Sequence, residues 1–325
     1  MIVPQYWAEA QVKKRLKDRQ ITIKRFGWSD NSQDEAQAMA RQRAEEGMAR
    51  ALSGQSIDRQ ELKRAYNGAE GVPIREEIVA RHDDTVITRN SYGALCLNTP
   101  DVLFADIDFR KKPGSAVTRL CQLVLVIVAA YIGFKMDSLR VFFIAAIVAV
   151  LLAYVVADVV AKLWISVSGG LENMTLKSVQ QFAAQHPQWH LRIYRTPAGL
   201  RVLAMHQTFD PNGPEAQEFF KAVNADPLYV RMCQNQHCFR ARLTPKPWRI
   251  GLDEPMRYRK AVWPIAEDKL PQRQKWVADY ERASVAYAAC RFLTKIGSDK
   301  VDPKARAAQS LHDKYCRTDR NLEIA

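Results

Sequence analysis

Two long apolar runs stand out from a chain that otherwise mixes hydrophobic and polar positions. The first extends from Leu120 to Phe134 without a charge, and the second extends from Val141 to Ala161 with Asp158 as its one charge. Helices in a soluble core usually carry a polar face every 3.6 residues, and neither run has one. We therefore predict a two-helix transmembrane hairpin over residues 116–165 rather than a pair of buried core helices.

The residues that flank the hairpin predict its orientation. Four basic side chains precede the first run, Lys162 and Lys177 follow the second, and the link between the runs, 135–140, is short. Basic flanks favour the cytoplasmic side of a membrane. We therefore expect both large soluble parts, and with them the N and C termini, to be cytoplasmic. Asp158 is expected at the membrane interface.

The first soluble part, residues 1–115, is predicted to contain helices followed by strands. A basic amphipathic helix is expected to begin near Tyr6, and Ser32 is expected to cap a helix that ends near Leu52. From residue 72 the pattern changes to a period of two, which is typical of β-strands. The remaining expected elements are a strand at 21–26, a short helix at 58–66, and strands at 85–88, 94–97 and 102–109.

The second soluble part, residues 166–325, contains both patterns. The turn sequence Thr-Pro-Ala-Gly at 196–199 joins two alternating segments, 190–195 and 200–206, which predicts a β-hairpin. The other expected elements are helices at 176–186 (capped by Thr175), 214–223, 227–232, 271–294 and 303–317, and strands at 239–243 and 248–251.

The order of these elements predicts an α+β fold, with a mostly antiparallel sheet and flanking helices, interrupted by the transmembrane hairpin. Strand patterns occur on both sides of the hairpin, and neither soluble part looks large enough to fold alone. We therefore expect one composite domain whose sheet takes strands from both parts. Two independent cytoplasmic domains are the alternative.

Composition narrows the range of functions. The 325 residues contain 48 Lys and Arg against 35 Asp and Glu, which gives a net charge of +13. A hydrophobic fraction of 47% excludes a wholly disordered chain, and six scattered cysteines exclude a disulfide scaffold. An excess of basic residues is typical of proteins that contact nucleic-acid phosphates or anionic lipid.

Two acidic residues in one strand are the first candidate site. Asp106 and Asp108 are two residues apart, and residues two apart in a strand share a face. Paired carboxylates at the end of an apolar strand suit a Mg²⁺ or Mn²⁺ site for phosphoryl chemistry. The alternative is that both acids face solvent or pair with an arginine.

Two basic segments could bind phosphates. The predicted hairpin carries Arg192, Arg195 and Arg201, and His206 at its end could contact phosphate or donate a proton. More often such a histidine is simply hydrogen-bonded at the edge of a sheet. The second segment interleaves cations with aromatic residues and carries Arg240, Arg242, Lys246 and Arg249. An anionic membrane surface would attract the same side chains, and acids on the closing helices could pair with them.

A zinc site is a further alternative. Cys233, His237 and Cys238 lie close together, and His312 and Cys316 are spaced i, i+4 on one predicted helix. These residue types could bind zinc, but the spacing is loose and no second Cys-x-x-Cys occurs. We therefore expect ordinary buried thiols rather than zinc.

Two resemblances add to this picture. The strings RTPAGLR at 195–201 and CFRARLTPKPWR at 238–249 resemble those of an uncharacterised family of membrane-anchored bacterial proteins, which implies the bacterial inner membrane but no activity. The strand with Asp106 and Asp108, and the later strand that ends in His206, resemble motifs of the archaeo-eukaryotic primase superfamily. There the acids bind metal and the histidine contacts nucleotide phosphates. Ala204 replaces that family's small hydroxyl residue, and no third acidic strand is evident.

Two functional hypotheses follow from these observations. The first is a membrane-anchored protein that binds nucleotide or nucleic-acid phosphates, with Mg²⁺- or Mn²⁺-dependent phosphoryl or nucleotidyl transfer as its extension. In this hypothesis Asp106 and Asp108 hold the metal, and the arginines hold phosphates beside His206. The second is a non-catalytic scaffold whose basic faces bind membrane lipid or an acidic protein partner.

Overall fold

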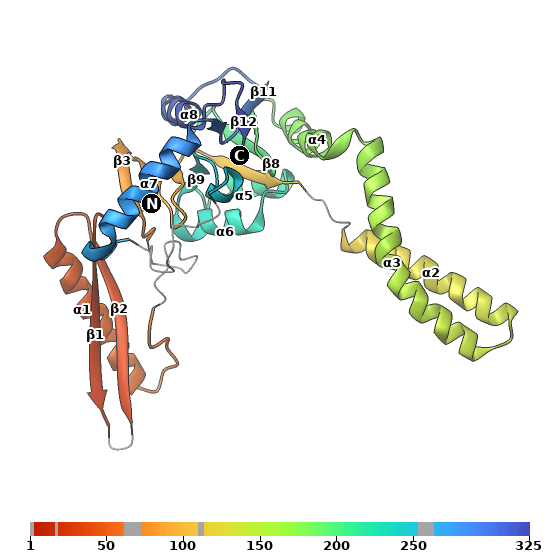
Figure 1. Cartoon of the computed structure of the whole chain (residues 1–325), viewed down its shortest axis with the longest axis horizontal. Coiled ribbons are helices and arrows are strands. Elements are labelled where there is room, and N and C mark those ends of the chain that lie inside the picture. The colour runs from red at the N-terminus through yellow and green to blue at the C-terminus, as the bar shows by residue number, and fades with distance from the viewer. Residues whose placement is uncertain (1–2, 17–18, 62–72, 110–113, 253–262) are drawn as a thin grey trace.

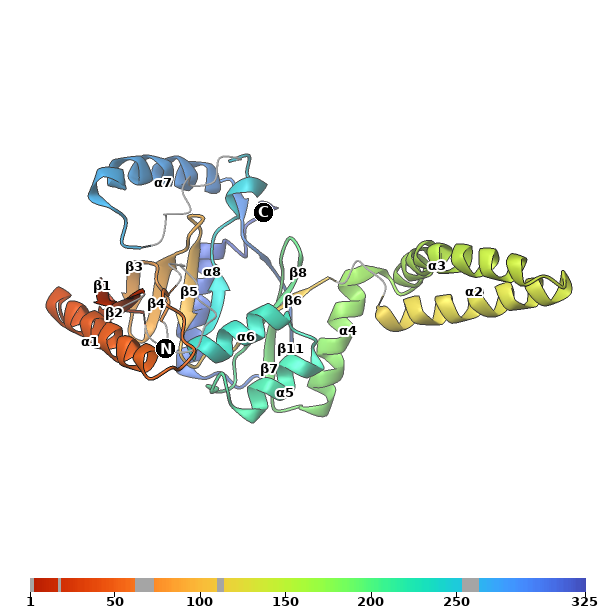
Figure 2. The same cartoon turned by 90° about the horizontal axis from the view of Figure 1, so that it is seen from below.

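Two four-stranded antiparallel sheets form the centre of the soluble part. The computed structural model describes residues 3–16, 19–61, 73–109, 114–252 and 263–325, and Figures 1 and 2 show its arrangement. The fold is α+β, as the sequence predicts. The first sheet has the order β3 (Glu77–His82), β4 (Thr85–Arg89), β5 (Leu95–Thr99), β9 (Phe239–Arg242), and the second has the order β11 (Arg291–Gly297), β7 (His190–Arg195), β8 (Gly199–Ala204), β6 (Phe104–Asp108).

Each sheet contains strands from both sides of the apolar hairpin. In the first sheet β5 pairs with β9, and Leu97 lies opposite Ala241. In the second sheet β6 pairs with β8, and Asp106 lies opposite Arg201. The two soluble parts therefore share their sheets, and the strands form two sheets instead of the single sheet that the sequence led us to expect.

One hydrophobic core joins the two sheets to four helices. These are α4 (Gly170–Gln185), α5 (Pro214–Ala222), α6 (Pro227–Gln236) and α8 (Pro303–Cys316). They contribute Phe182, Phe219, Tyr229 and Ala308 to the same cluster that contains Phe104 of β6. α5, α6 and α8 begin at the predicted residues. α4 begins six residues before the predicted start at 176, so Thr175 lies inside the helix and does not cap it.

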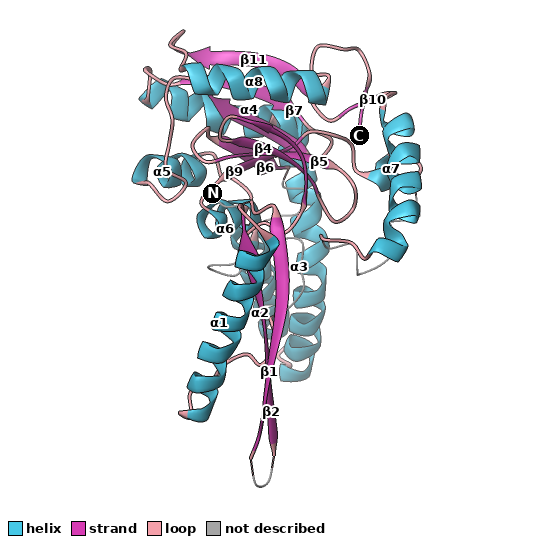
Figure 3. Cartoon of the chain, turned by 90° about the vertical axis from the view of Figure 1, so that its left-hand side faces the viewer, coloured by secondary structure: helices cyan, strands magenta, loops and turns pink. Residues whose placement is uncertain are grey.

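The N-terminal segment forms a long β-hairpin rather than the predicted helix. β1 (Tyr6–Arg15) pairs with β2 (Gln20–Ser29) over ten residues, and α1 (Gln33–Leu52) packs along the hairpin. In Figures 1 and 3 this unit projects from the body as an arm. The helix prediction was wrong because Ala8, Ala10 and Val12 alternate with polar residues, which is a strand pattern. The basic cluster that follows interrupts this pattern. The predicted cap on α1 is confirmed, since the Ser32 side chain accepts from the Glu35 amide.

Three C-terminal and loop predictions also need correction. The helix expected at 271–294 ends earlier, because α7 (Leu270–Ser284) gives way to the short strand β10 (Tyr287–Ala288) and then to β11. The strand expected at 248–251 is a 3₁₀ turn, η1 (Pro247–Arg249), which begins at a proline. Residues 58–61 are not helical, and the rest of the helix expected at 58–66 lies outside the described residues.

The two apolar runs form an antiparallel helical pair that projects from the body (Figure 2). α2 (Ser115–Lys135) and α3 (Leu139–Val167) are long and apolar enough to cross a membrane. At 1.5 Å per residue they reach about 31 and 43 Å, so each is long enough to cross a hydrocarbon core of roughly 30 Å. Leu120 and Leu151 are among many large apolar side chains that they expose. Both features support association with a membrane.

Small residues hold the two helices of the pair together. The buried positions of α2 and α3 include Ala129, Gly133, Ala149 and Ala153. A Cβ atom at Gly133 would approach the Cβ of Phe142 to 2.6 Å, so glycine is needed for this contact. Close packing through small residues is typical of helices that associate in lipid. Asp158 forms an i, i+4 ion pair with Lys162, 2.7 Å away.

Candidate functional site

A cavity of about 400 Å³ lies where the edges of the two sheets meet. Its wall includes the end of β6, the turn after β4, the start of α6 and the segment that follows β9. Its volume is within the range of roughly 300–1,000 Å³ that is typical of small-molecule sites. The charged residues that line it are four acids, Glu76, Asp106, Asp108 and Asp226, and five cations, Arg201, Arg240, Arg242, Lys246 and Arg249.

Hydrogen bonds fix the segment that carries the cations after β9. The Leu95 amide donates to Thr244 Oγ1 at 2.8 Å, and the Leu243 amide donates to the Leu95 carbonyl at 2.8 Å. The buried Tyr280 hydroxyl of α7 lies 2.7 Å from the Pro245 carbonyl oxygen. The chain then enters η1, so Lys246 and Arg249 are held on a short, anchored loop.

The turn after β4 supplies the aromatic part of the cavity. The Asn90 side chain accepts from the amides of Tyr92 and Ala94 at 3.2 and 3.0 Å, which closes the turn. Gly93 has φ +94°, and a Cβ there would collide with the Trp276 ring, so glycine is required. The Tyr92 ring makes an edge contact with the ring of the exposed Trp248, with centroids 5.3 Å apart.

Two of the lining arginines are already neutralised. Arg201 is 2% exposed and contacts both oxygens of Asp106, at 2.7 and 3.1 Å. Arg240 contacts both oxygens of Glu76, at 2.8 and 2.7 Å, and also donates to Asn98 Oδ1 at 2.7 Å. These arginines are therefore structural members of the wall rather than free phosphate ligands.

The other three cations have no carboxylate partner among the described residues. Arg242, Lys246 and Arg249 are half-buried, and no ion pair involves them within that part of the chain. Arg242 Nε and Arg249 Nη1 are buried without a hydrogen-bond acceptor. Burial and the neighbouring arginines lower the pKa of Lys246, and burial and Arg242 lower the pKa of Arg249. Buried donors without acceptors cost free energy, so an anion in the cavity would be stabilised.

The acids line the same cavity. As predicted, Asp106 and Asp108 line one site, although Asp106 is held by Arg201. Burial raises the pKa of Asp108, and the nearby carboxylates of Asp226 and Asp106 raise it further. Asp226 caps α6, and its amide donates to the Asp106 carbonyl at 2.9 Å. Asp108 and Asp226 are thus the acids that a cation would stabilise.

Three of the predicted site residues do not line this cavity. Arg192 pairs with Asp313 at 3.2 Å, and Arg195 pairs with Glu172 at 2.6 Å. His206 is 3% exposed and packs against the rings of Trp189 and Phe209. Burial lowers the pKa of His206 to about 4, and the charges of Lys300 and His190 lower it in the same direction. At neutral pH this imidazole is uncharged and lies in an aromatic cluster.

A second cavity, of about 520 Å³, lies on the other side of the second sheet's edge strand β11. It is lined by Arg192, Arg291 and Arg320 together with Asp313 and Asp319. Arg192 is engaged by Asp313, and Arg291 donates to the Leu322 carbonyl at 2.7 Å. Arg291 Nε is buried without an acceptor, but the first cavity has two such nitrogens, on Arg242 and Arg249, together with the acids Asp108 and Asp226. The first cavity is therefore the better candidate for an anion that carries a metal ion.

Several lining residues of the first cavity are not marked as site residues by the sequence. Glu76 precedes the predicted strand at 85–88, Tyr229 lies in a predicted helix, and Tyr92 lies in a turn signal. Asp226 precedes Pro227, a pattern that is typical of a helix N-cap. The acid that accompanies Asp108 could therefore be recognised only after the start of α6 had been placed against β6.

Comparisons of the chain with family models, with curated proteins and with solved structures find no match. Function is therefore inferred from the geometry of the cavity.

Proposed function

We propose that the cavity binds the phosphates of a nucleotide, with Arg242, Lys246 and Arg249 as the phosphate ligands. The observation that carries the proposal is the set of half-buried cations without a carboxylate partner among the described residues, two of which have buried nitrogens with no acceptor. Phosphate oxygens are strong acceptors that guanidinium groups bind in a bidentate manner. A phosphate group would supply the missing acceptors and reduce the repulsion among the three cations.

The acids of the cavity support a metal-bound form of the nucleotide. Burial and the nearby carboxylate of Asp226 disfavour the ionised form of Asp108 and raise its pKa. Mg²⁺ or Mn²⁺ is commonly bound by one or two carboxylates together with substrate phosphates. We infer that Asp108 and Asp226 would ligate the ion, and that Asp106 acts through Arg201 to shape the wall. We further propose that the metal-bound nucleotide is the substrate of phosphoryl or nucleotidyl transfer.

The proposal places the cavity beside the bacterial inner membrane, with both soluble parts and both termini in the cytoplasm. Asp108 is separated from the first residue of α2, Ser115, by only seven steps along the chain. An extended chain covers at most about 3.6 Å per step, so the acid lies within about 25 Å of that helix. The basic residues that flank the membrane-spanning pair favour a cytoplasmic location for both soluble parts.

The first test is nucleotide binding by the full chain in detergent micelles. We expect saturable binding of ATP in the presence of Mg²⁺, measured by isothermal titration calorimetry. The double variant Lys246→Met, Arg249→Met loses two charge-assisted contacts, each worth about 1.5–3 kcal/mol. The dissociation constant for ATP should therefore rise by a factor of roughly 100 or more. Adenosine, which lacks phosphates, should not bind.

Arg195→Met provides the matched control. Arg195 is a predicted phosphate ligand that lies outside the cavity and pairs with Glu172. Its replacement should leave the affinity for ATP unchanged within a factor of two, which is about 0.4 kcal/mol. Equal losses in Arg195→Met and in the double variant would indicate nonspecific attraction by the basic surface. That result would favour the scaffold hypothesis.

A further inference from the structure

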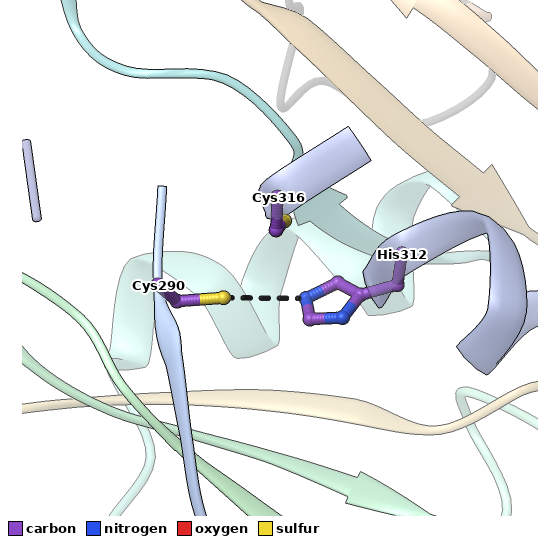
Figure 4. Close-up of side chains that lie close together, drawn as sticks. All are labelled: Cys290, His312 and Cys316. Atoms are coloured by element: carbon purple, nitrogen blue, oxygen red, sulfur yellow. Dashed lines mark hydrogen bonds between the residues drawn. The ribbon is translucent and has the colours of Figure 1, made fainter. Parts of the chain in front are cut away.

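Three metal-binding side chains converge in the core behind the cavity. Cys290 lies between β10 and β11, and His312 and Cys316 lie four residues apart on the last turns of α8. Their ligand atoms all lie within 4.8 Å of one another, and each residue is 0% exposed. Figure 4 shows the three side chains pointing toward a common point, with the Cys290 sulfur facing the His312 ring.

The distance between the Cys290 and His312 ligand atoms matches one edge of a zinc tetrahedron. Zn–S and Zn–N bonds of about 2.3 and 2.0–2.1 Å at tetrahedral angles put a sulfur and a nitrogen ligand about 3.6 Å apart. The distance between Cys290 Sγ and His312 Nε2 is 3.7 Å. In the metal-free protein the same separation suits a hydrogen bond between the thiol and the imidazole.

The surroundings prepare the histidine for this role. His312 Nδ1 contacts Asp313 Oδ1 at 2.9 Å, which orients the ring and leaves Nε2 facing Cys290. Histidines that bind metals usually donate their other nitrogen to a carboxylate or carbonyl in this way. Arg201 Nη1 lies 3.4 Å from His312 Nε2. The Arg201 Nη1 group donates instead to the Arg242 carbonyl oxygen, 2.7 Å away.

We propose that Cys290, His312 and Cys316 bind a structural Zn²⁺ ion. Two thiolates and Zn²⁺ cancel in charge, so the ion adds no net charge beside the Arg201–Asp106 pair. Among the described residues no fourth His, Cys, Asp or Glu joins the group. The fourth position is left to a buried water or to the Arg242 carbonyl oxygen, which lies 3.7 Å from Cys316 Sγ.

The proposed ion would connect two segments of the chain. It would join the end of α8 to the chain between β10 and β11, next to the arginine of β8 that holds Asp106. A zinc ion that binds only the folded chain stabilises the folded state. The ion would therefore fix the back wall of the cavity without taking part in binding there.

The test is metal analysis of the full chain purified in detergent under reducing conditions. We expect about one zinc per chain, and removal by a chelator should lower the melting temperature by roughly 5–10 °C, reversibly on adding Zn²⁺. Cobalt introduced into the metal-free protein should give the intense visible absorption of a tetrahedral Co²⁺ ion and a near-ultraviolet thiolate band. The cobalt spectrum needs no variant, so it remains informative if substitutions impair folding.

Variants identify the ligands. Cys290→Ser and Cys316→Ser should each abolish stoichiometric zinc, whereas Cys233→Ser, at another fully buried thiol, should retain it. Zinc absent from the reduced wild-type protein, or a Cys290–Cys316 disulfide in its place, would overturn the proposal. So would zinc retained at the wild-type level in both cluster variants. None of these readouts depends on nucleotide binding, so the two proposals can fail separately.

Discussion

Glu76→Gln is expected to lower the free energy of unfolding by about 3–5 kcal/mol, the cost of leaving one member of a buried ion pair without its partner. Glu76 is 2% exposed, accepts from the Thr88 hydroxyl at 2.6 Å, and contacts Arg240 with both carboxylate oxygens. The amide cannot neutralise the guanidinium, and its NH₂ group would face the Arg240 donors. Urea unfolding of the full chain in detergent, followed by near-ultraviolet circular dichroism, measures the change.

Glu172→Gln is the control for this prediction. Glu172 pairs with Arg195 at 2.6 Å, but its side chain is 44% exposed and solvent can replace the partner. Surface pairs contribute about 0–1 kcal/mol, so this variant should unfold close to the wild type. Similar losses in the two variants would show that burial of the Glu76–Arg240 pair has no special cost.

The two acids of β6 are expected to respond in opposite ways to neutralisation. Asp106→Asn leaves the 3%-exposed side chain of Arg201 without its charged partner and should lower the free energy of unfolding by about 3 kcal/mol. Asp108→Asn removes a charge that burial, Asp226 and Asp106 destabilise in the folded state, as the raised pKa of Asp108 indicates. This variant should therefore be at least as stable as the wild type at neutral pH.

The pH dependence gives the sign of the Asp108 effect. A carboxyl group with a raised pKa in the folded state binds its proton more tightly there than in the unfolded chain. Ionisation of Asp108 therefore costs stability as the pH rises through the folded-state pKa. The advantage of Asp108→Asn should be full above that pKa and should vanish below the ordinary pKa of aspartate. Melting temperatures between pH 3.5 and 7.5 measure it, and a variant less stable than the wild type at neutral pH would contradict the prediction.

Local patterns predicted most of the regular elements, and the errors have physical causes. The apolar runs of α2 and α3, the turn between β7 and β8, and the cap of α1 are strong local signals. β1 and β11 were assigned to helices because both contain residues that also favour helices. Their strand conformation depends on pairing with β2 and β7, and the pattern within one segment does not specify a partner.

The candidate site was predictable only in part for the same reason. The two-residue spacing correctly placed Asp106 and Asp108 at one cavity, and the basic segment after residue 238 supplies its cations. The pairing of Asp106 with Arg201, 95 residues away, follows from the register of β6 against β8, which the sequence does not reveal. His206 follows β8 and packs against Trp189 and Phe209. It therefore lies outside the cavity that the predicted arginines Arg201 and Arg240 line.

Photoaffinity mapping tests the central claim most directly. The full chain in detergent is irradiated with an azido derivative of ATP in the presence of Mg²⁺, and the labelled peptides are identified by mass spectrometry. The proposal predicts saturable labelling that excess ATP prevents, within residues 90–92 or 226–249 around the cavity. Labelling confined to the second cavity near Arg291 and Arg320, or labelling that ATP does not compete, would contradict it.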